Sequence, residues 1–292
     1  MSVTSAITAA VQGRSLWEDA RRRLFRNKAA VTGMVVLGLL VIAAVVGPWL
    51  SPFAYDQVDK NDVWLPPLTE GHLLGSDALG RDLLTRLLVG LRVSLAIGLI
   101  ATLVSLVIGV TWGAVAGYVG GKLDEVMMRF VDVLYSLPFI FFVILLMVTF
   151  GSNIVLIFVA IGAVEWLTMS RIVRGQTLTL KQKEFIEAAR ASGLGQGAII
   201  ARHIVPNLLG PVVVYVTLTI PAVILAESFL SFLGLGVQPP MASLGALIAG
   251  GAQDMELAPW LLIFPSLVMI TTLMSFNFIG DGLRDAIDPK DR

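Results

Sequence analysis

Long uncharged stretches alternate with short charged segments along this chain. No Asp, Glu, Lys or Arg occurs in residues 29–55, 93–121, 133–164, 203–226, 228–253 and 257–280. A membrane-spanning helix needs about 20 largely apolar residues, and polar breaks at 151–153 and 236–240 subdivide these stretches. The pattern predicts an all-α transmembrane fold with six spanning helices, at residues 30–50, 93–117, 131–150, 153–171, 208–233 and 258–280.

Basic residues fall mainly on one side of these predicted spans. If the N-terminus lies in the cytoplasm, only Lys60, Arg81, Arg86 and Arg92 of the 21 basic residues lie outside. Cytoplasmic loops carry the excess of Lys and Arg, so we expect both termini inside and residues 236–257 outside. The expected division is an N-terminal segment 1–29, a first span 30–50, an extracytoplasmic segment 51–92, a core of five spans 93–280 and a tail 281–292.

Composition supports a membrane protein and excludes several kinds of site. The chain is 56% hydrophobic and 14% charged, against about a quarter charged in soluble domains. Equal numbers of basic and acidic residues, 21 each, give no basic excess, and we expect no nucleic-acid partner. The chain has no cysteine, so it has no disulfide or thiolate metal site. The first apolar run is too long for a cleaved signal peptide.

Two amphipathic helices are predicted next to the spans. Residues 15–28 place apolar side chains opposite arginines, a pattern typical of a helix in the lipid headgroup layer. A basic flank that only sets topology remains an equal alternative. Within 82–88, Asp82 and Arg86 are four residues apart, as are Leu83 and Leu87, which indicates a short helix leading into the second span.

Small residues recur at every fourth position of the second span. Gly109, Gly113 and Gly117 belong to this series and fall on one helical face. Such a face lets another helix approach closely. We predict helix packing here, which is compatible with a moving pore helix.

Enzymatic chemistry has little support in the sequence. The segment AGYVGGKL departs from the phosphate-binding P-loop pattern at both its first glycine and its last position. His72 and His203 are the two histidines, and the predicted topology puts them on opposite sides of the membrane. We therefore expect no catalytic residue, no metal site and no cofactor in this chain.

Three acidic residues lie in or at the ends of the predicted spans. Asp132 and Glu165 lie toward cytoplasmic ends, and Glu227 lies six residues before Leu233. A charge inside the membrane is costly, so such residues often mark a transport path. A proton relay and a hydrogen-bonded acid at a helix contact are both compatible with the sequence.

A polar helix–turn–helix, the 181–207 hairpin, separates the fourth and fifth spans. Its first helix places Phe185, Ala188, Ala189 and Ser192 on one side, so that a partner surface can come close. Glu187 and Arg190 are three apart and are expected to pair beside that side. Gly193 is expected to end this helix in a left-handed conformation, and Pro206 to mark the entry to the fifth span.

The hairpin resembles the EAA loop of bacterial ABC importer permeases. The match consists of EAARASG, which begins at Glu187, followed by RHIVPN, which contains Pro206; His203 and Val205 depart from the generic pattern. The segments LLGSDALGRDLLTRLLVGLRVSL, MMRFVDVLYSLP, ESFLSFLGLGVQPP and GDGLRDAIDP resemble the dipeptide/oligopeptide/nickel branch, in the same order. The resemblance covers roughly residues 16–290 and is nearest to the C-type permease subunit.

This resemblance implies a type I ABC importer permease architecture, with the hairpin as a cytoplasmic coupling helix. It implies a heterodimer with a homologous permease, two cytoplasmic ATPases that hold ATP and Mg, and an extracytoplasmic binding protein that delivers di- or oligopeptides. It also implies a place in the bacterial inner membrane. By analogy, the ATPase-coupling residues are Glu184, Glu187, Ala188, Ala189, Arg190, Gly193 and Pro206.

Other functions remain open at this stage. A proton-coupled secondary transporter would use Glu165 or Glu227 as its carrier. An ABC importer of the same branch could instead carry nickel complexes or another small solute. A non-transport scaffold or a membrane enzyme is the third alternative, although the sequence offers no nucleophile with a nearby base.

Overall fold

The computed structural model describes residues 16–151 and 154–287, which form helices and loops without a β-strand. The predicted terminal segments lie partly outside these residues, at 1–15 and 288–292. The elements are α1 (Leu16–Arg26), α2 (Lys28–Leu50), α3 (Leu83–Val119), α4 (Gly121–Ser136), α5 (Phe139–Phe150), α6 (Ile154–Leu180), α7 (Glu184–Ala191), α8 (Gln196–Ile199), the π-helical turn η2 (Ile200–Ile204), α9 (Val205–Phe232), α10 (Leu244–Gln253) and α11 (Trp260–Ile287).

The described helices include five candidate membrane crossings, and a sixth if one bent pair of helices counts as a single span. Five are long and apolar enough to span a membrane: α2, α3, α6, α9 with the helical turns before it, and α11. The pair α4 and α5, bent by 82° at a short break, is either one broken span, which would be the sixth, or a re-entrant loop. The prediction of an all-α transmembrane fold is confirmed.

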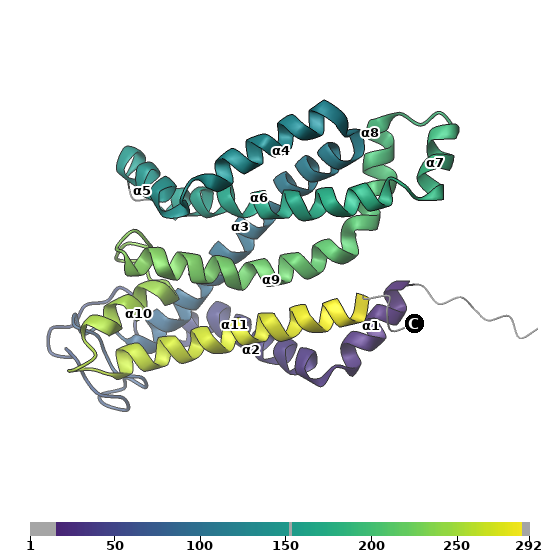
Figure 1. Cartoon of the computed structure of the whole chain (residues 1–292). Helices are drawn as coiled ribbons and strands as arrows, with labels where there is room; N and C mark the ends of the chain where they lie inside the picture. The colour runs from purple at the N-terminus through teal and green to yellow at the C-terminus, as the bar shows by residue number, and fades with distance from the viewer. Residues whose placement is uncertain (1–15, 152–153, 288–292) are drawn as a thin grey trace, which may run out of the picture.

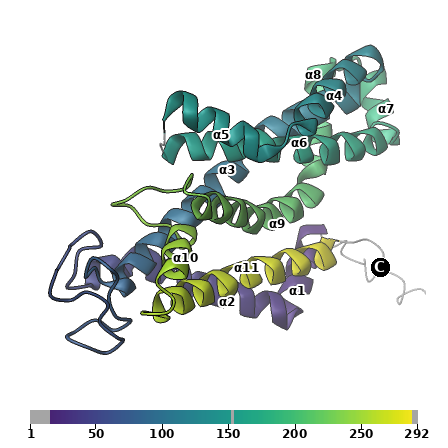
Figure 2. The ribbon, with the colours of Figure 1, turned by 60° about the vertical axis from the view of Figure 1, so that its left-hand side comes forward.

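The long helices run between two distinct ends of the molecule (Figure 1). One end carries α1, α7, α8 and the end of α11, and we call it the hairpin end. The other carries residues 51–82 and α10, and we call it the loop end. A second view keeps the same separation (Figure 2). The two ends correspond to the two sides predicted from the basic residues, with the 51–82 segment opposite the hairpin.

Helix α3 packs against both α6 and α9, and its glycines set the distance to α6. A Cβ atom added at Gly109 would lie 2.5 Å from Met169 Cβ, and one at Gly113 would lie 2.4 Å from the Ser170 carbonyl oxygen. At Gly117 it would lie 2.8 Å from Thr177 Cβ. Distances this short mean that backbone and Cβ atoms of α6 occupy the space of the missing side chains. The predicted helix-packing role of the three glycines is confirmed.

The second span begins earlier than predicted, at Leu83 and not at residue 93. Asp82 caps it, since its carboxylate accepts a hydrogen bond from Thr85 N. Leu83, Arg86 and Leu87 are buried and continue the same helix. The short amphipathic helix predicted at 82–88 is therefore the first part of α3. Burial of Leu83, Arg86 and Leu87 at the loop end keeps this charged first turn helical.

The third span is a broken helix where a single helix, 131–150, was predicted. Pro138 separates α4 from α5, and Leu137 before it is extended, with φ −77° and ψ 128°. A proline lacks the N–H of a helical hydrogen bond and disfavours helical geometry in the residue before it. Pro138 therefore breaks the helix that was predicted as continuous, and the uninterrupted apolar pattern around it gave no sign of the break.

Three other helix boundaries differ from the predictions. α6 continues nine residues past the expected end at 171, as far as Leu180. α9 follows η2 directly, so the predicted second short helix is continuous with the fifth span. The segment 236–257, for which no helix was predicted, contains α10, which Ser243 caps through a hydrogen bond from Ala246 N.

Candidate functional site

The 181–207 hairpin forms the predicted helix–turn–helix at one end of the molecule (Figure 1). Its first helix is α7, and α8 with η2 forms the second. Gly193 has φ +79°, the left-handed conformation that was predicted for it. Gly193 N donates to the Arg190 carbonyl at 2.9 Å, and Leu194 N donates to the Ala189 carbonyl at 3.2 Å. These two bonds form a Schellman C-cap, which fixes the direction of the turn.

The inner face of α7 packs against the rest of the chain. Ile186 is fully buried and Ala189 is 6% exposed, and both belong to one apolar cluster. The other members include Tyr118 of α3, Met169 of α6 and Ile199 of α8. The hairpin is therefore a fixed extension of the helix ends beneath it.

The outer face of α7 is solvent-exposed. Phe185 is 41% exposed, and Glu184, Glu187, Ala188 and Ser192 are exposed as well. The prediction that Ala189 shares this face with Ala188 is wrong, since Ala189 is buried by its own chain. The two alanines are adjacent in sequence and lie about 100° apart around the helix, so one faces inward and the other outward.

Arg190 connects the hairpin to the end of α3. Its Nε donates to the Tyr118 hydroxyl at 3.1 Å, and its guanidinium carbon lies 5.1 Å from the centre of the Tyr118 ring. The expected pair with Glu187 is absent from the ion pairs between described residues. Arg190 therefore positions α7, while the carboxylates of Glu184 and Glu187 remain on the exposed side.

Pro206 lies in the first turn of α9 and is exposed. The π-helical turn η2 comes immediately before it, and Val205 N bonds to the Ile200 carbonyl. A proline has no N–H with which to continue the i to i−4 hydrogen bonds. Pro206 is thus at the entry to the fifth span, as predicted, and the helix passes through it without a break.

Two ion pairs join α4 to α6 close to the hairpin. Arg174 donates a bidentate pair of hydrogen bonds to Asp124, at 2.6 Å from Nε to Oδ1 and 2.7 Å from Nη2 to Oδ2. Arg171 Nη2 lies 2.8 Å from Asp132 Oδ1, and its guanidinium stacks over Tyr135 at 4.3 Å. Asp132 therefore has an ion-pair partner at the helix contact. Asp124 was not among the predicted site residues, because its partner Arg174 lies 50 residues away in the sequence.

We expect the two aspartates to contribute unequally to stability. Asp124 and Arg174 side chains are 12% and 35% exposed, whereas those of Asp132 and Arg171 are 52% and 39% exposed. Asp124→Asn should lower stability by about 1–3 kcal/mol, because a partly buried, charged and bidentate hydrogen-bond pair is broken. Asp132→Asn should cost about 0–1 kcal/mol, as solvent-exposed pairs do. Thermal unfolding of both variants in one detergent measures the difference, and equal losses would contradict it.

Glu227 is completely buried near the loop end and accepts hydrogen bonds from three serines. Ser231 Oγ and Ser243 Oγ lie 2.6 and 2.7 Å from Glu227 Oε1, and Ser94 Oγ lies 3.5 Å from Oε2. Ser94 Oγ also accepts from Leu244 N at 3.0 Å. The carboxylate therefore joins α3, α9 and the start of α10, which is the hydrogen-bonded arrangement left open by the sequence.

Glu165 lies on α6 and is partly buried. In the described part of the chain it has no ion pair with Arg171 or Arg174, which bind Asp132 and Asp124. Among the described residues, no hydrogen bond or ion pair joins Asp132, Glu165 and Glu227 to one another. Among residues 16–151 and 154–287, no group of three or more His, Asp or Glu is placed to hold a metal ion.

Comparison with known families gives two matches. Residues 109–292 match the family described as binding-protein-dependent transport system inner membrane component. Residues 15–67 match the family described as the N-terminal TM domain of oligopeptide transport permease C. Together they cover α1, α2 and everything from the middle of α3 onward.

Several curated proteins are similar over nearly the whole chain. The oligopeptide transport system permease protein OppC of Escherichia coli K12 is 58% identical over 97% of this chain and 94% of its own length. The Haemophilus influenzae protein of the same name is 57% identical, over 97% and 91%. The dipeptide transport system permease protein DppC of Bacillus subtilis is 45% identical, over 94% and 86%.

One solved structure supports the fold assignment. A chain of the MetNI methionine ABC transporter, in an inward-facing conformation, matches with a TM-score of 0.57. The match covers 69% of this chain and 96% of the other, at 21% identity. The expected ABC importer permease architecture is confirmed at the level of fold.

Proposed function

Because this chain belongs to the family of binding-protein-dependent transport system inner membrane components, we propose that it is one permease subunit of an ATP-driven importer of di- or oligopeptides. It would form the translocation path together with a homologous permease. The support for peptides is the identity of 45–58% to oligopeptide and dipeptide permeases over nearly the full chain. Nickel complexes are the alternative substrate in the same branch, and no comparison favours them.

The observation that carries the mechanism is the construction of the 181–207 hairpin. Its inner face is packed onto α3, α6 and α8, and its outer face presents Phe185, Ala188, Glu184 and Glu187 to solvent. A rigid, exposed helix of this kind fits the groove of a cytoplasmic ATPase. Closure of two ATPases on ATP and Mg would then move the hairpin together with the helix ends beneath it. The ATPases must contact α7 differently in their two states for this to drive transport.

The hairpin end is proposed to face the cytoplasm of a bacterial cell, and the 51–82 segment to face the binding protein outside. The distribution of basic residues supports this orientation. The start of α1 and the end of α11 also lie at the hairpin end (Figure 1). α1 is positioned by Leu24, which packs close to Gly282 of α11, and Phe25 of α1 is exposed, as a contact with lipid headgroups requires.

A proton-coupled carrier is less consistent with the geometry. Glu227 is enclosed by three serines from three segments, and its bonds hold α10 in place. A carrier carboxylate must meet solvent alternately on both sides of the membrane, and a completely buried acid with three hydrogen-bond donors has no such access. The exposed hairpin favours transport driven by separate ATPases over transport driven by protons, because only an ATPase needs a docking helix in this chain.

Reconstitution tests the proposal directly. The chain is co-purified with its homologous permease and ATPases, placed in proteoliposomes, and supplied with the binding protein and labelled peptides of two to five residues. We expect uptake that requires ATP, Mg and the binding protein together. Liposomes without the ATPases serve as the control and should be inactive even under a pH gradient. Uptake driven by the pH gradient alone would refute the proposal, and ATP-driven uptake of nickel but no peptide would change the substrate.

A further inference from the structure

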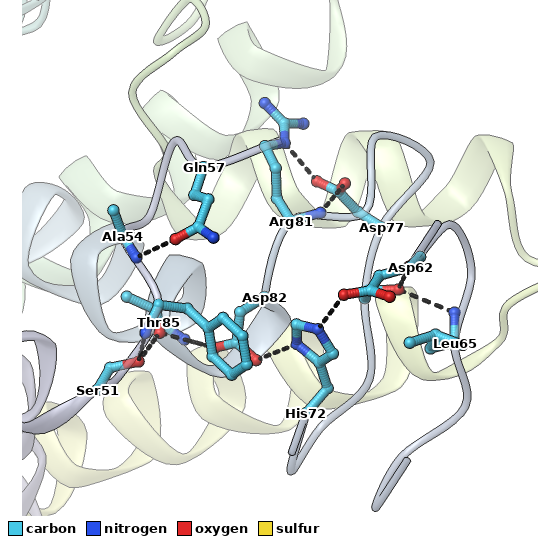
Figure 3. A network of polar contacts seen from close by, with 12 residues as sticks. Ser51, Ala54, Gln57, Asp62, Leu65, His72, Asp77, Arg81, Asp82 and Thr85 are labelled. Carbon is cyan, nitrogen blue, oxygen red and sulfur yellow. Dashed lines mark hydrogen bonds and ion pairs between the residues drawn. The ribbon is translucent and has the colours of Figure 1, made fainter. Parts of the chain in front are cut away.

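A buried histidine lies between two carboxylates in the 51–82 segment (Figure 3). His72 is 1% exposed, with Nδ1 at 2.9 Å from Asp82 Oδ1 and Nε2 at 3.3 Å from Asp62 Oδ2. The ring of Phe53 stacks on the imidazole at 4.3 Å between centroids. Both ring nitrogens are thus directed at acids, and the imidazole itself is shielded from solvent, while the Asp62 side chain is 18% exposed.

The two aspartates belong to different parts of the fold. Asp82 is the N-cap of α3, and its other oxygen accepts from Thr85 N and Thr85 Oγ1, both at 2.7 Å. Asp62 lies in the preceding loop, where its carbonyl accepts a hydrogen bond from Ser76 Oγ. His72 therefore connects the preceding loop to the start of a spanning helix.

The hydrogen-bond chemistry specifies the charge of the ring. An ionised carboxylate only accepts hydrogen bonds, and a neutral imidazole has one N–H donor and one acceptor nitrogen. With a neutral ring, one of the two carboxylates would face a nitrogen lone pair at hydrogen-bond distance. Only the doubly protonated imidazolium donates to Asp62 and Asp82 at the same time.

The other charges near this site are paired among themselves. Arg81 Nε lies 2.7 Å from Asp77 Oδ2, and Arg86 Nε lies 3.4 Å from the same oxygen. Arg86 also donates to the Tyr55 carbonyl at 3.2 Å. In the described part of the chain, Asp62 and Asp82 are thus the charged groups that face His72, with Phe53 covering the ring.

We propose that His72 is a proton-dependent latch, which when doubly protonated fastens the Asp62 loop to the N-cap of α3 and which releases that loop when it loses its Nε2 proton. The shorter bond to Asp82 is kept after this loss, because Asp82 is itself held by Thr85. The Asp62 contact is the one that opens. In the proposed orientation this latch lies on the extracytoplasmic side, but its operation does not depend on which solute is carried.

The pKa supports the direction of the effect. Burial lowers the pKa of His72, but the hydrogen bonds and charges of Asp82 and Asp62 outweigh burial and leave it raised above its usual 6.5. A group whose pKa is higher in the folded state stabilises that state at low pH. The stabilisation of the folded state by protonated His72 is fully present below the pKa that His72 has in the unfolded chain. It is lost as the pH rises through the pKa that His72 has in the folded chain. The latch is therefore closed in acid and opens toward alkaline pH.

Nitrogen NMR of the full chain in lipid nanodiscs tests the protonation state. The chain has two histidines, so a His203→Gln variant labelled with ¹⁵N-histidine reports on His72 alone. We expect two protonated ring nitrogens at pH 6, and loss of the Nε2 proton at a pH above the ordinary histidine range. A ring with a single proton at pH 6 would overturn the proposal.

Hydrogen exchange tests whether protonation holds the loop. We expect the backbone amides of residues 59–65 to lose protection between pH 6 and pH 9, after correction for the intrinsic pH dependence of exchange. Asp62→Asn provides a matched variant, because its amide N–H can donate to a neutral Nε2. This variant should stay protected at both pH values, while peptides from α7 serve as an internal reference. The same loss of protection in the wild type and Asp62→Asn, or none in the wild type, would overturn the latch.

Discussion

Gly193→Trp is expected to reduce ATP-driven uptake at least about tenfold while the chain still inserts and assembles. Gly193 has φ +79°, and any other residue in this left-handed region costs roughly 1–2 kcal/mol. The space beside it is open, since an added Cβ would meet no atom within 4 Å. The indole would therefore project from the exposed turn toward the ATPase. The measurement is uptake per ATP hydrolysed in proteoliposomes.

Gly193→Ala separates the two effects of this change. It carries the same backbone cost but adds only one carbon, so uptake should stay near that of the wild type. Glu187→Lys reverses a charge on the exposed face without touching the turn, and it should uncouple ATP hydrolysis from uptake as the tryptophan does. If the tryptophan and alanine variants transport equally well, the turn does not lie at an ATPase contact.

Glu227→Ala is expected to destabilise the loop end severely. The substitution removes the acceptor for Ser231, Ser243 and Ser94 in a fully buried site. A buried polar group left without a partner costs about 1–3 kcal/mol, and here several lose theirs together. We expect a marked fall in the thermal midpoint and faster proteolysis in residues 236–257. Expression level and limited proteolysis in nanodiscs provide the readout.

Glu227→Gln distinguishes this structural role from proton transport. The glutamine Oε1 can accept from Ser231 and Ser243, and its Nε2–H can donate to Ser94, whose oxygen has a free lone pair. The variant cannot carry a proton as a carboxylate does. Near-normal stability and uptake are therefore expected, and a stable variant without transport would revive the proton-carrier alternative.

The sequence predicted the hairpin well because its signals are local. Gly193 ends α7 as expected, since a left-handed C-cap needs a residue without a Cβ. The four-residue spacing of Gly109, Gly113 and Gly117 likewise required a close helix contact, and α6 provides it. The long apolar stretches were sufficient to place five of the six predicted spans in order along the chain.

The failures concern relations between distant residues. Ala188 and Ala189 look equivalent in sequence, and Ala189 is the buried one because α7 packs it into an apolar cluster with distant residues such as Tyr118 and Met169. The ion pair Asp124–Arg174 and the contacts of His72 with Asp62 likewise join residues that are separated in the sequence, so no local pattern predicts them. α10 was missed because its small and glycine-rich residues are helical only where Ser243, Glu227 and Ser94 hold its start.

The sequence by itself determined that the chain crosses the membrane several times, which side carries the arginines, and that a glycine-capped hairpin interrupts the spans. These properties depend on hydrophobicity and local backbone preferences, which act over a few residues. Only the tertiary structure decided which face of α7 is free, what Glu227 bonds to and which acids surround His72. Those outcomes depend on helices packed side by side, where burial makes each missing hydrogen bond or misplaced charge costly.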